Sequence, residues 1–149
     1  MPWGGAVALE LLGRHAEAIR AADEAVRLMP ESRDAVNGPT VAIQRAWVLI
    51  HGRGARAEDG YAEFERLLGA YPGTIAGIKD SSGAWNSVRA LLDRFAPRGF
   101  AVFPGNEALL LAAMRGGGAG CISATANVNP AAIGELYRGW QRPDANEQQ

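Results

Sequence analysis

The sequence has little lysine and cysteine and no long apolar run. Of its 149 residues, 15 are Lys or Arg, and Lys79 is the single lysine. Cys121 is the single cysteine, which excludes an internal disulfide and suits a reducing compartment. The longest apolar stretches, such as 46–50 and 108–114, are far too short to span a bilayer. A disulfide-stabilised scaffold and an integral membrane helix are therefore not expected.

The charge balance is close to neutral. The net charge is −1 and the arginines are scattered, so the sequence has no electrostatic footprint for nucleic acid. With 48% hydrophobic and 21% charged residues, the chain can bury a core. The N-terminus lacks a basic region and Glu10 interrupts its apolar stretch, so we expect no signal peptide. We expect a globular cytoplasmic protein with no membrane partner.

Lys79 is the most informative single residue. A generic surface cation in this chain is arginine, whereas a desolvated lysine can lose its proton and become a nucleophile. Lys79 ends the apolar run 74–78 and precedes the turn-forming segment 80–83. This pattern is typical of a buried strand that delivers a side chain to the rim of an α/β fold. A chance surface lysine explains the same composition and spacing.

Residues 1–70 have the pattern of a helical segment. Apolar residues recur at helical spacing before Pro30, with a break at Gly13 and Arg14. Two further helical patterns follow, one ending at the glycine-rich break 52–54 and the other before Pro72. The two prolines end similar helical pairs 42 residues apart, which is compatible with a repeat of about 34 residues carrying an insertion.

This helical half resembles the tetratricopeptide repeat. Residues 12–19 with Ala25 and 28–30 resemble the end of one repeat, and the stretch from 46 to 72 resembles a looser second one. Small residues such as Ala18 suit the close packing of paired helices. Two repeats are fewer than the three or so that stack stably, so they would need a neighbour.

From Pro72 the sequence alternates between predicted strands and helices. We expect strands at 74–78, 100–103 and 120–124, and helices at 85–94, 108–115 and 130–140. Asn106 and Asn129 are the expected N-caps of the last two helices. Three strands, each followed by a helix, indicate βαβ units and a parallel sheet. Residues 142–149 form a polar tail.

Three segments of this second half resemble the dihydrodipicolinate synthase/N-acetylneuraminate lyase family of Schiff-base enzymes. They are Gly77-Ile78-Lys79-Asp80-Ser81-Ser82-Gly83, then Phe103-Pro104-Gly105-Asn106-Glu107, then Gly118 through Val128. In the family these are strands six, seven and eight of a (β/α)8 barrel. The expected fold class is thus an α/β C-terminal half, a partial TIM barrel over 71–141, behind an α-helical, tetratricopeptide-like N-terminal half.

The resemblance implies specific roles for residues at the rim. Lys79 matches the lysine that forms an imine with pyruvate or a related 2-keto acid. Gly105 and Glu107 match the loop that shapes the site, and Ile122 and Ser123 match the backbone region that lines it. No cofactor or metal is implied. Alternatively, Gly105 makes a plain strand-to-helix turn, Glu107 satisfies a helix N-terminus and Ser123 is a packing residue.

The sequence departs from the family pattern in several places. A complete barrel takes roughly 250 residues, and the resemblance covers about half of this chain. The loop that binds the keto-acid carboxylate is missing. Tyr61, Tyr71 and Tyr137 all lack the context of the family's proton-relay tyrosine. His51 lies 28 residues before Lys79, near the position expected for that tyrosine, although a histidine at such a break is typically solvated.

Three interpretations follow. In the first, the chain is a lyase of this family, truncated, that binds 2-keto acids and obtains the missing strands from a homo-oligomer or a protein partner. In the second, it is a helical-repeat interaction module fused to an inert barrel remnant. In the third, a fusion, frameshift or assembly join near 67–72 produces the change of pattern. Open sheet edges lead us to expect an oligomeric or aggregation-prone protein.

Overall fold

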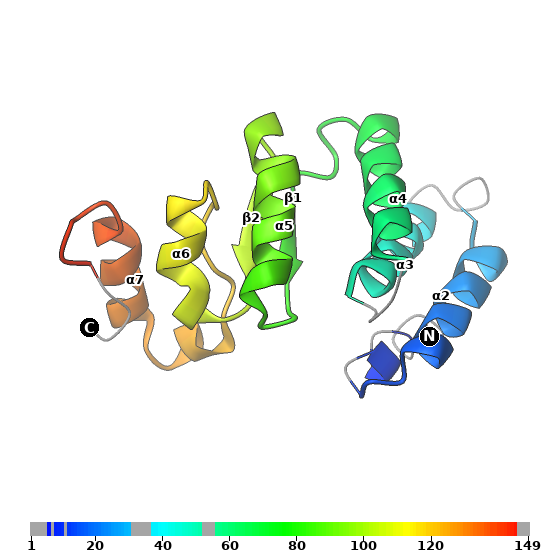
Figure 1. Cartoon of the computed structure of the whole chain (residues 1–149), viewed down its shortest axis with the longest axis horizontal. Helices are drawn as coiled ribbons and strands as arrows, with labels where there is room; N and C mark the ends of the chain where they lie inside the picture. The colour runs from blue at the N-terminus through cyan, green and yellow to red at the C-terminus, as the bar shows by residue number, and fades with distance from the viewer. Residues whose placement is uncertain (1–5, 7, 11, 31–36, 52–55, 146–149) are drawn as a thin grey trace. The chain divides into compact units, whose positions relative to one another are not determined.

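The protein folds into two compact units. In the computed structural model they are Met1–Ile75 and Ala76–Gln149, shown in Figure 1. The structure describes residues 6, 8–10, 12–30, 37–51 and 56–145. Within these residues, every helix is too short or too polar to cross a membrane.

The first unit is helical, as predicted. Its helices are α2 (His15–Leu28), α3 (Asn37–His51) and α4 (Ala57–Ala70), and α3 packs against both of the others. The predicted break at Gly13 is confirmed, since α2 begins just after it and the φ of Gly13 is 74°. The predicted break at 52–54 lies outside the described residues. The tetratricopeptide assignment of these helices stays a prediction.

Small residues let the helices of the first unit approach closely. Ala18 and Ala22 of α2 are 0% and 4% exposed, in one cluster with Val48 of α3. At Gly60 of α4, a Cβ atom would lie 2.7 Å from the carbonyl oxygen of Ala46 in α3. Real Cβ atoms essentially never come this close, so α3 and α4 can pack at this distance only with glycine here.

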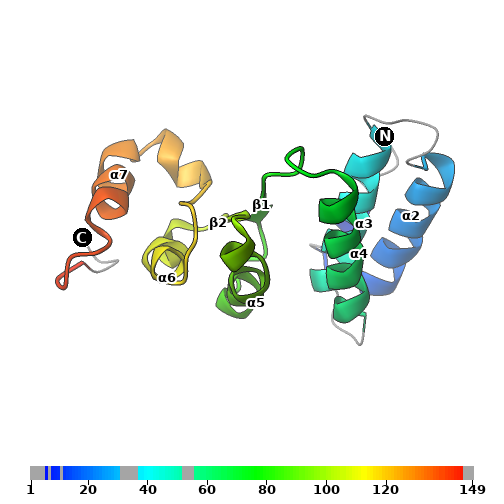
Figure 2. The same cartoon turned by 90° about the horizontal axis from the view of Figure 1, so that it is seen from above.

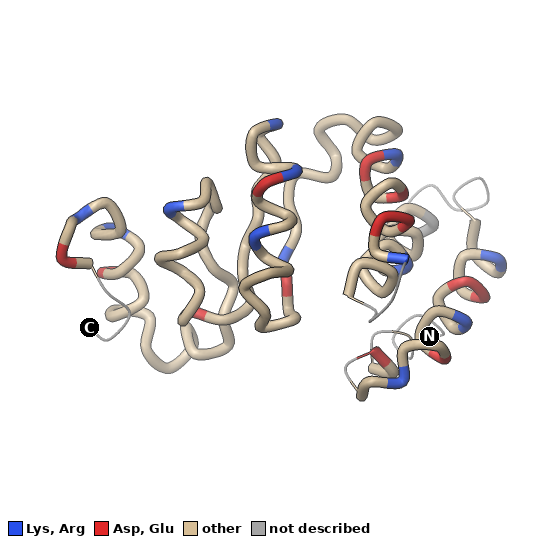
Figure 3. The backbone as a smooth tube through the Cα atoms, in the orientation of Figure 1, with Lys and Arg blue, Asp and Glu red and all other residues tan. Residues whose placement is uncertain are grey.

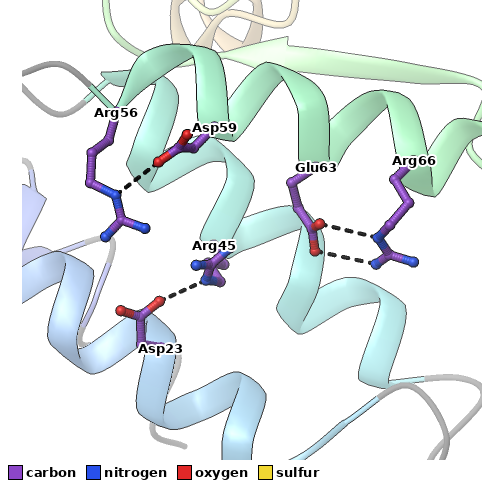
Figure 4. A network of polar contacts seen from close by, with 6 residues as sticks. All are labelled: Asp23, Arg45, Arg56, Asp59, Glu63 and Arg66. Carbon is purple, nitrogen blue, oxygen red and sulfur yellow. Dashed lines mark hydrogen bonds and ion pairs between the residues drawn. The ribbon is translucent and has the colours of Figure 1, made fainter.

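Ion pairs lie on the surface of the first unit. Nε of Arg45 in α3 lies 2.7 Å from Oδ1 of Asp23 in α2, which joins the two helices (Figure 4). Two pairs are local to α4, Arg56 with Asp59 and Glu63 with Arg66, both at 3.1 Å. In Figure 3, acidic and basic residues alternate along α2, whereas α4 carries mainly acidic residues. Such exposed pairs contribute about 0–1 kcal/mol each, so the apolar helix contacts supply most of the stability.

The second unit is built around a parallel two-stranded sheet. Its elements are β1 (Gly77–Asp80), α5 (Trp85–Phe95), η1 (Ala96–Arg98), β2 (Ala101–Pro104), η2 (Glu107–Leu109), α6 (Leu110–Arg115), η3 (Ala124–Asn127) and α7 (Pro130–Gly139). In the register of the pair, Lys79 lies opposite Phe103. The predicted parallel pairing and the alternation of strand and helix are therefore confirmed for two strands.

The first strand begins three residues later than predicted. The N–H of Thr74 donates to the carbonyl oxygen of Tyr71 at 3.2 Å, and Gly73 between them has a φ of 75°. Residues 71–74 thus form a turn after α4 and are not available for the sheet. Lys79 consequently lies within β1, one residue before its end.

The predicted third strand at 120–124 is wrong, although its first residues lie beside β2. The N–H groups of Ala119 and Ile122 donate to the carbonyl oxygens of Val102 and Pro104 at 3.1 and 3.0 Å. These donors are three residues apart while the acceptors are two apart, so the register slips. Pro104 also has no N–H to donate on this side. Two hydrogen bonds therefore form, but no regular ladder.

Helices α5 and α6 lie on one side of the sheet (Figure 2), and both contact β2. Four residues of α5 at positions i, i+3, i+4 and i+7 are buried, namely Val88, Leu91, Leu92 and Phe95. Val102 of β2 and Leu110 of α6 are each 0% exposed. The core of the second unit therefore lies between the two helices and this face of the sheet.

Both asparagines predicted as N-caps lie at helix starts, but of the two Asn106 alone makes a side-chain cap hydrogen bond. Asn106 is confirmed as an N-cap, because its Oδ1 accepts the N–H of Ala108 at 3.0 Å. This cap opens η2, and α6 follows directly. Asn129 occupies the N-cap position of α7, as predicted, although its side chain makes no cap hydrogen bond. Pro130, at the first helical position, starts α7 without one.

Candidate functional site

Lys79 lies on the sheet face away from α5 and α6. Successive side chains of a strand point to opposite faces, and the alternation of burial in β1 and β2 follows this rule. Asp80 and Val102 are fully buried on the helix-covered face, whereas Lys79 is exposed and Phe103 is half-buried on the other. In the second unit, the side chain of Lys79 is thus open to solvent.

Gly105 makes room for the lysine at the end of the sheet. Its N–H donates to the carbonyl oxygen of Asp80 at 2.6 Å. A Cβ atom at position 105 would lie 2.8 Å from that oxygen and 3.2 Å from Cε of Lys79. The structure therefore brings Gly105 and Lys79 together, and it requires glycine for the close approach and not only for a turn.

Glu107 and Ser123 form a second pair. The hydroxyl of Ser123 donates to Oε2 of Glu107, and its oxygen accepts the N–H of Thr125 as the N-cap of η3. Hydrogen bonds from Ser123, from the backbone of Glu107 itself and from Thr125 hold the pKa of the Glu107 carboxyl below its ordinary value. Glu107 therefore stays ionised at neutral pH and links the loop after β2 to η3.

Ile122 lies between the Lys79–Gly105 pair and the Glu107–Ser123 pair, since it is bonded to the end of β2 and precedes Ser123. Its N–H is bonded to Pro104, the neighbour of Gly105, and its side chain is 47% exposed. Cys121, beside it, is partly buried, and burial together with the charge of Glu107 raises the pKa of its thiol. Cys121 therefore remains a protonated thiol at neutral pH and is a poor nucleophile.

Asp80 and Ser87 are the residues that sequence analysis missed. The Asp80 side chain is 0% exposed. Its Oδ1 accepts the N–H of Ser82 and its Oδ2 accepts the hydroxyl proton of Ser87, both at 2.7 Å. The available signal was an aspartate at a strand end followed by Ser-Ser-Gly, a sequence that favours a side-chain-capped turn.

A cavity of about 310 Å³ is lined by residues of η2, η3 and α7. Its lining residues are Glu107, Ala108, Thr125, Asn129, Ala132, Ile133 and Leu136. Of the five predicted site residues, Glu107 is the one that lines it. The cavity is therefore distinct from the open face that carries Lys79. In the part of the chain that the structure describes, no group of three His, Cys, Asp or Glu residues could hold a metal ion.

His51 belongs to the first unit and is the last residue of α3, not a solvated loop residue. Its ring stacks on Trp47 with centroids 4.2 Å apart, and Nδ1 lies 2.8 Å from the Trp47 carbonyl oxygen. Since a carbonyl oxygen only accepts, Nδ1 carries the proton of this bond. These contacts explain the histidine as part of helix packing.

Comparison with known proteins places the chain in a family. The model of the dihydrodipicolinate synthetase family matches residues 61–149, which is more than half of the chain. The chain belongs to this family, and the resemblance seen in the sequence is confirmed at this level. The match starts within α4 and contains all of the second unit. No solved structure matches at a significant level.

Similar curated proteins carry one name. A 4-hydroxy-tetrahydrodipicolinate synthase of Leptothrix cholodnii is 37% identical over 105 residues, covering 70% of this chain and 35% of the relative. Those of Azoarcus sp. (strain BH72) and Cellvibrio japonicus are 42% and 47% identical over 95 and 62 residues, covering 64% and 42% of this chain. The chain spans about a fifth to a third of these relatives. The 105-residue match is longer than the 74-residue second unit, so it also includes part of the first unit.

Because the backbone approaches Gly105 closely, adding a methyl group there should lower the free energy of unfolding more than adding one at an open glycine. Gly105→Ala should destabilise the protein by about 1–3 kcal/mol in urea unfolding, because the new Cβ overpacks the strand end. Gly69→Ala is the matched control, since a Cβ there meets nothing within 4 Å. In a helix this control should change stability by less than about 1 kcal/mol. Equal stabilities of the two variants would contradict the account of Gly105.

The Glu107–Ser123 contact predicts a titration shift. Ser123→Ala should raise the pKa of the Glu107 carboxyl toward its ordinary value, measured by NMR of side-chain carboxyl carbons against pH. Since the folded-state pKa is lowered, Glu107 contributes stability above its ordinary pKa of about 4.3. That contribution is lost as the pH falls through the lower folded-state value. A Glu107 titration identical in wild type and Ser123→Ala would refute the contact, and Ser81→Ala serves as the control.

Proposed function

We propose that the chain is a class I, Schiff-base lyase of its family, in which Lys79 forms an imine with pyruvate or a related 2-keto acid. One observation carries the proposal. The only lysine of the chain lies at the C-terminal end of a parallel strand, inside the family match, with its Cε over Gly105. In (β/α)8 barrels, chemistry takes place at this end of the strands.

The proposed chemistry begins at the Lys79 amine. Neutral Nζ of Lys79 adds to the keto carbon, the adduct loses water, and a C=N bond replaces the C=O bond. The imine then accepts electrons when the neighbouring carbon loses a proton or breaks a carbon–carbon bond. Ile122 and Ser123 would line the substrate pocket from the segment beside β2, and Gly105 and Glu107 from the loop after it.

The parallel pair β1–β2 and the extended segment beside it correspond in this proposal to strands six to eight of a (β/α)8 barrel. The sheet face with Lys79 and Phe103 would then be the barrel interior, and α5 and α6 belong to the outer ring of helices. The carboxylate-binding loop and the proton-relay tyrosine would come from chain outside this region. We propose that a protein partner supplies these parts.

Reductive trapping tests the imine. We expect incubation with pyruvate and sodium borohydride to give a single covalent adduct, located by peptide mass spectrometry at Lys79. Because Lys79 is the only lysine, the α-amino group is the single competing primary amine. Lys79→Arg should abolish the adduct while leaving the circular dichroism spectrum unchanged. An unmodified Lys79 in the wild type would end the proposal.

Open sheet edges predict association. Among the described residues, no second strand pairs with the outer edge of β1, and Ile122 and Val128 are 47% and 83% exposed. Unpaired edges and exposed apolar residues favour pairing with another chain. We expect light scattering to report an oligomer or concentration-dependent aggregation. A monodisperse monomer that unfolds cooperatively is the contrary result.

The helical unit offers a second function, a protein-interaction module beside an inert barrel remnant. The buried small residues of α2 favour it, since close helix pairs are typical of helical repeats. In this alternative the pyruvate adduct is absent and a partner copurifies with the chain. Measurable lyase turnover without any captured partner would argue against it.

A further inference from the structure

Asp80 is a fully buried carboxylate next to the proposed imine lysine, and sequence analysis assigned it no role. Burying an ionised carboxylate costs several kcal/mol unless hydrogen bonds compensate. Here Ser82 and Ser87 each donate to a different oxygen at 2.7 Å. Charge-assisted bonds of this length are about twice as strong as neutral ones.

The hydrogen bonds of Asp80 reach three elements. Its side chain fixes the turn after β1 through Ser82 and the first turn of α5 through Ser87. Its carbonyl oxygen accepts the N–H of Gly105 at the end of β2. Asp80 therefore joins β1, α5 and β2 next to the point where the Lys79 side chain extends from the sheet.

We propose that Asp80, held by Ser87, is a positioning residue. It fixes the direction in which the Lys79 side chain extends from β1 over Gly105. The two side chains of the neighbouring residues lie on opposite faces of the strand, so Asp80 acts through the backbone and not by contact with the amine. This inference rests on the proposed imine for its chemical readout, while a second readout is independent of it.

The first readout is the rate of pyruvate–borohydride trapping in the full chain. Asp80→Ala should slow trapping about tenfold or more, because a displacement of about 1 Å at a reacting group is costly. Asp80→Asn should stay within about threefold of wild type, because its amide oxygen still accepts from Ser82 and its N–H can donate to the Ser87 hydroxyl. Asp93→Ala, an exposed aspartate of α5 paired with Arg89, is the matched control and should not change the rate.

The pH profile separates positioning from a charge effect. If Asp80 acts through the backbone, Asp80→Asn keeps the wild-type midpoint of trapping against pH. A charge effect on the amine would instead move that midpoint to lower pH. The Asp80 charge would favour the protonated amine, so its removal would let the amine lose its proton at lower pH. Such a movement would overturn the inference, as would trapping at the wild-type rate in Asp80→Ala.

The second readout is amide hydrogen exchange at Ser82 and Gly105. Asp80→Ala should accelerate both by about tenfold or more, with the amide of Leu92 in the same unit unchanged. Ser87→Ala removes the hydroxyl that donates to Asp80, leaves the carboxylate in place and should give a smaller effect, which keeps the test decisive if Asp80→Ala fails to fold. A wild type without a pyruvate adduct ends the proposed function alone. Unchanged exchange at Gly105 in Asp80→Ala and Ser87→Ala ends the positioning inference.

Discussion

The hydrogen bond between the N–H of Gly105 and the carbonyl oxygen of Asp80 is the contact on which the second unit depends. It ends the parallel pair β1–β2 and places the loop after β2 directly over Lys79. The absent side chain at position 105 permits an approach at which a Cβ would lie 2.8 Å from the carbonyl oxygen. From this point the chain continues through the cap at Asn106 into Glu107, so the same contact places the carboxylate that binds Ser123.

Local signals in the sequence predicted much of this unit, and tertiary contacts determined the rest. The periodicity of α5 and the cap at Asn106 depend on residues a few positions apart, and both were predicted. The strand at 120–124 had the right composition, but Pro104 removes a donor and the register slips, which a single strand's sequence does not reveal. The bond from Ser87 to Asp80 spans a turn and a helix start, so only the folded chain shows it.

The two units also differ in how their sequence relates to structure. Alanine-rich helices bury little per residue, and the first unit compensates by close approach at Gly60. Such packing arises in many helical proteins, so a repeat-like pattern in Ala18 or Ala25 is a weak predictor of a particular family. The family model starts within α4, and the match to the relative from Leptothrix cholodnii, over 105 residues, is longer than the second unit and so includes part of the first unit.

If Lys79 reacts as proposed, stability and reactivity are coupled on the open face of the sheet. Lys79 and Phe103 share this face, and Ile122 is 47% exposed beside it. A chain that covered the face would gain about 25 cal/mol for each Å² of apolar surface buried. The same covering would remove water from the Lys79 amine, and loss of water favours the neutral, nucleophilic form of an amine. Because one event supplies both effects, a partner selected only for closing the sheet would also activate the lysine, and the amine would remain solvated wherever the sheet stays open.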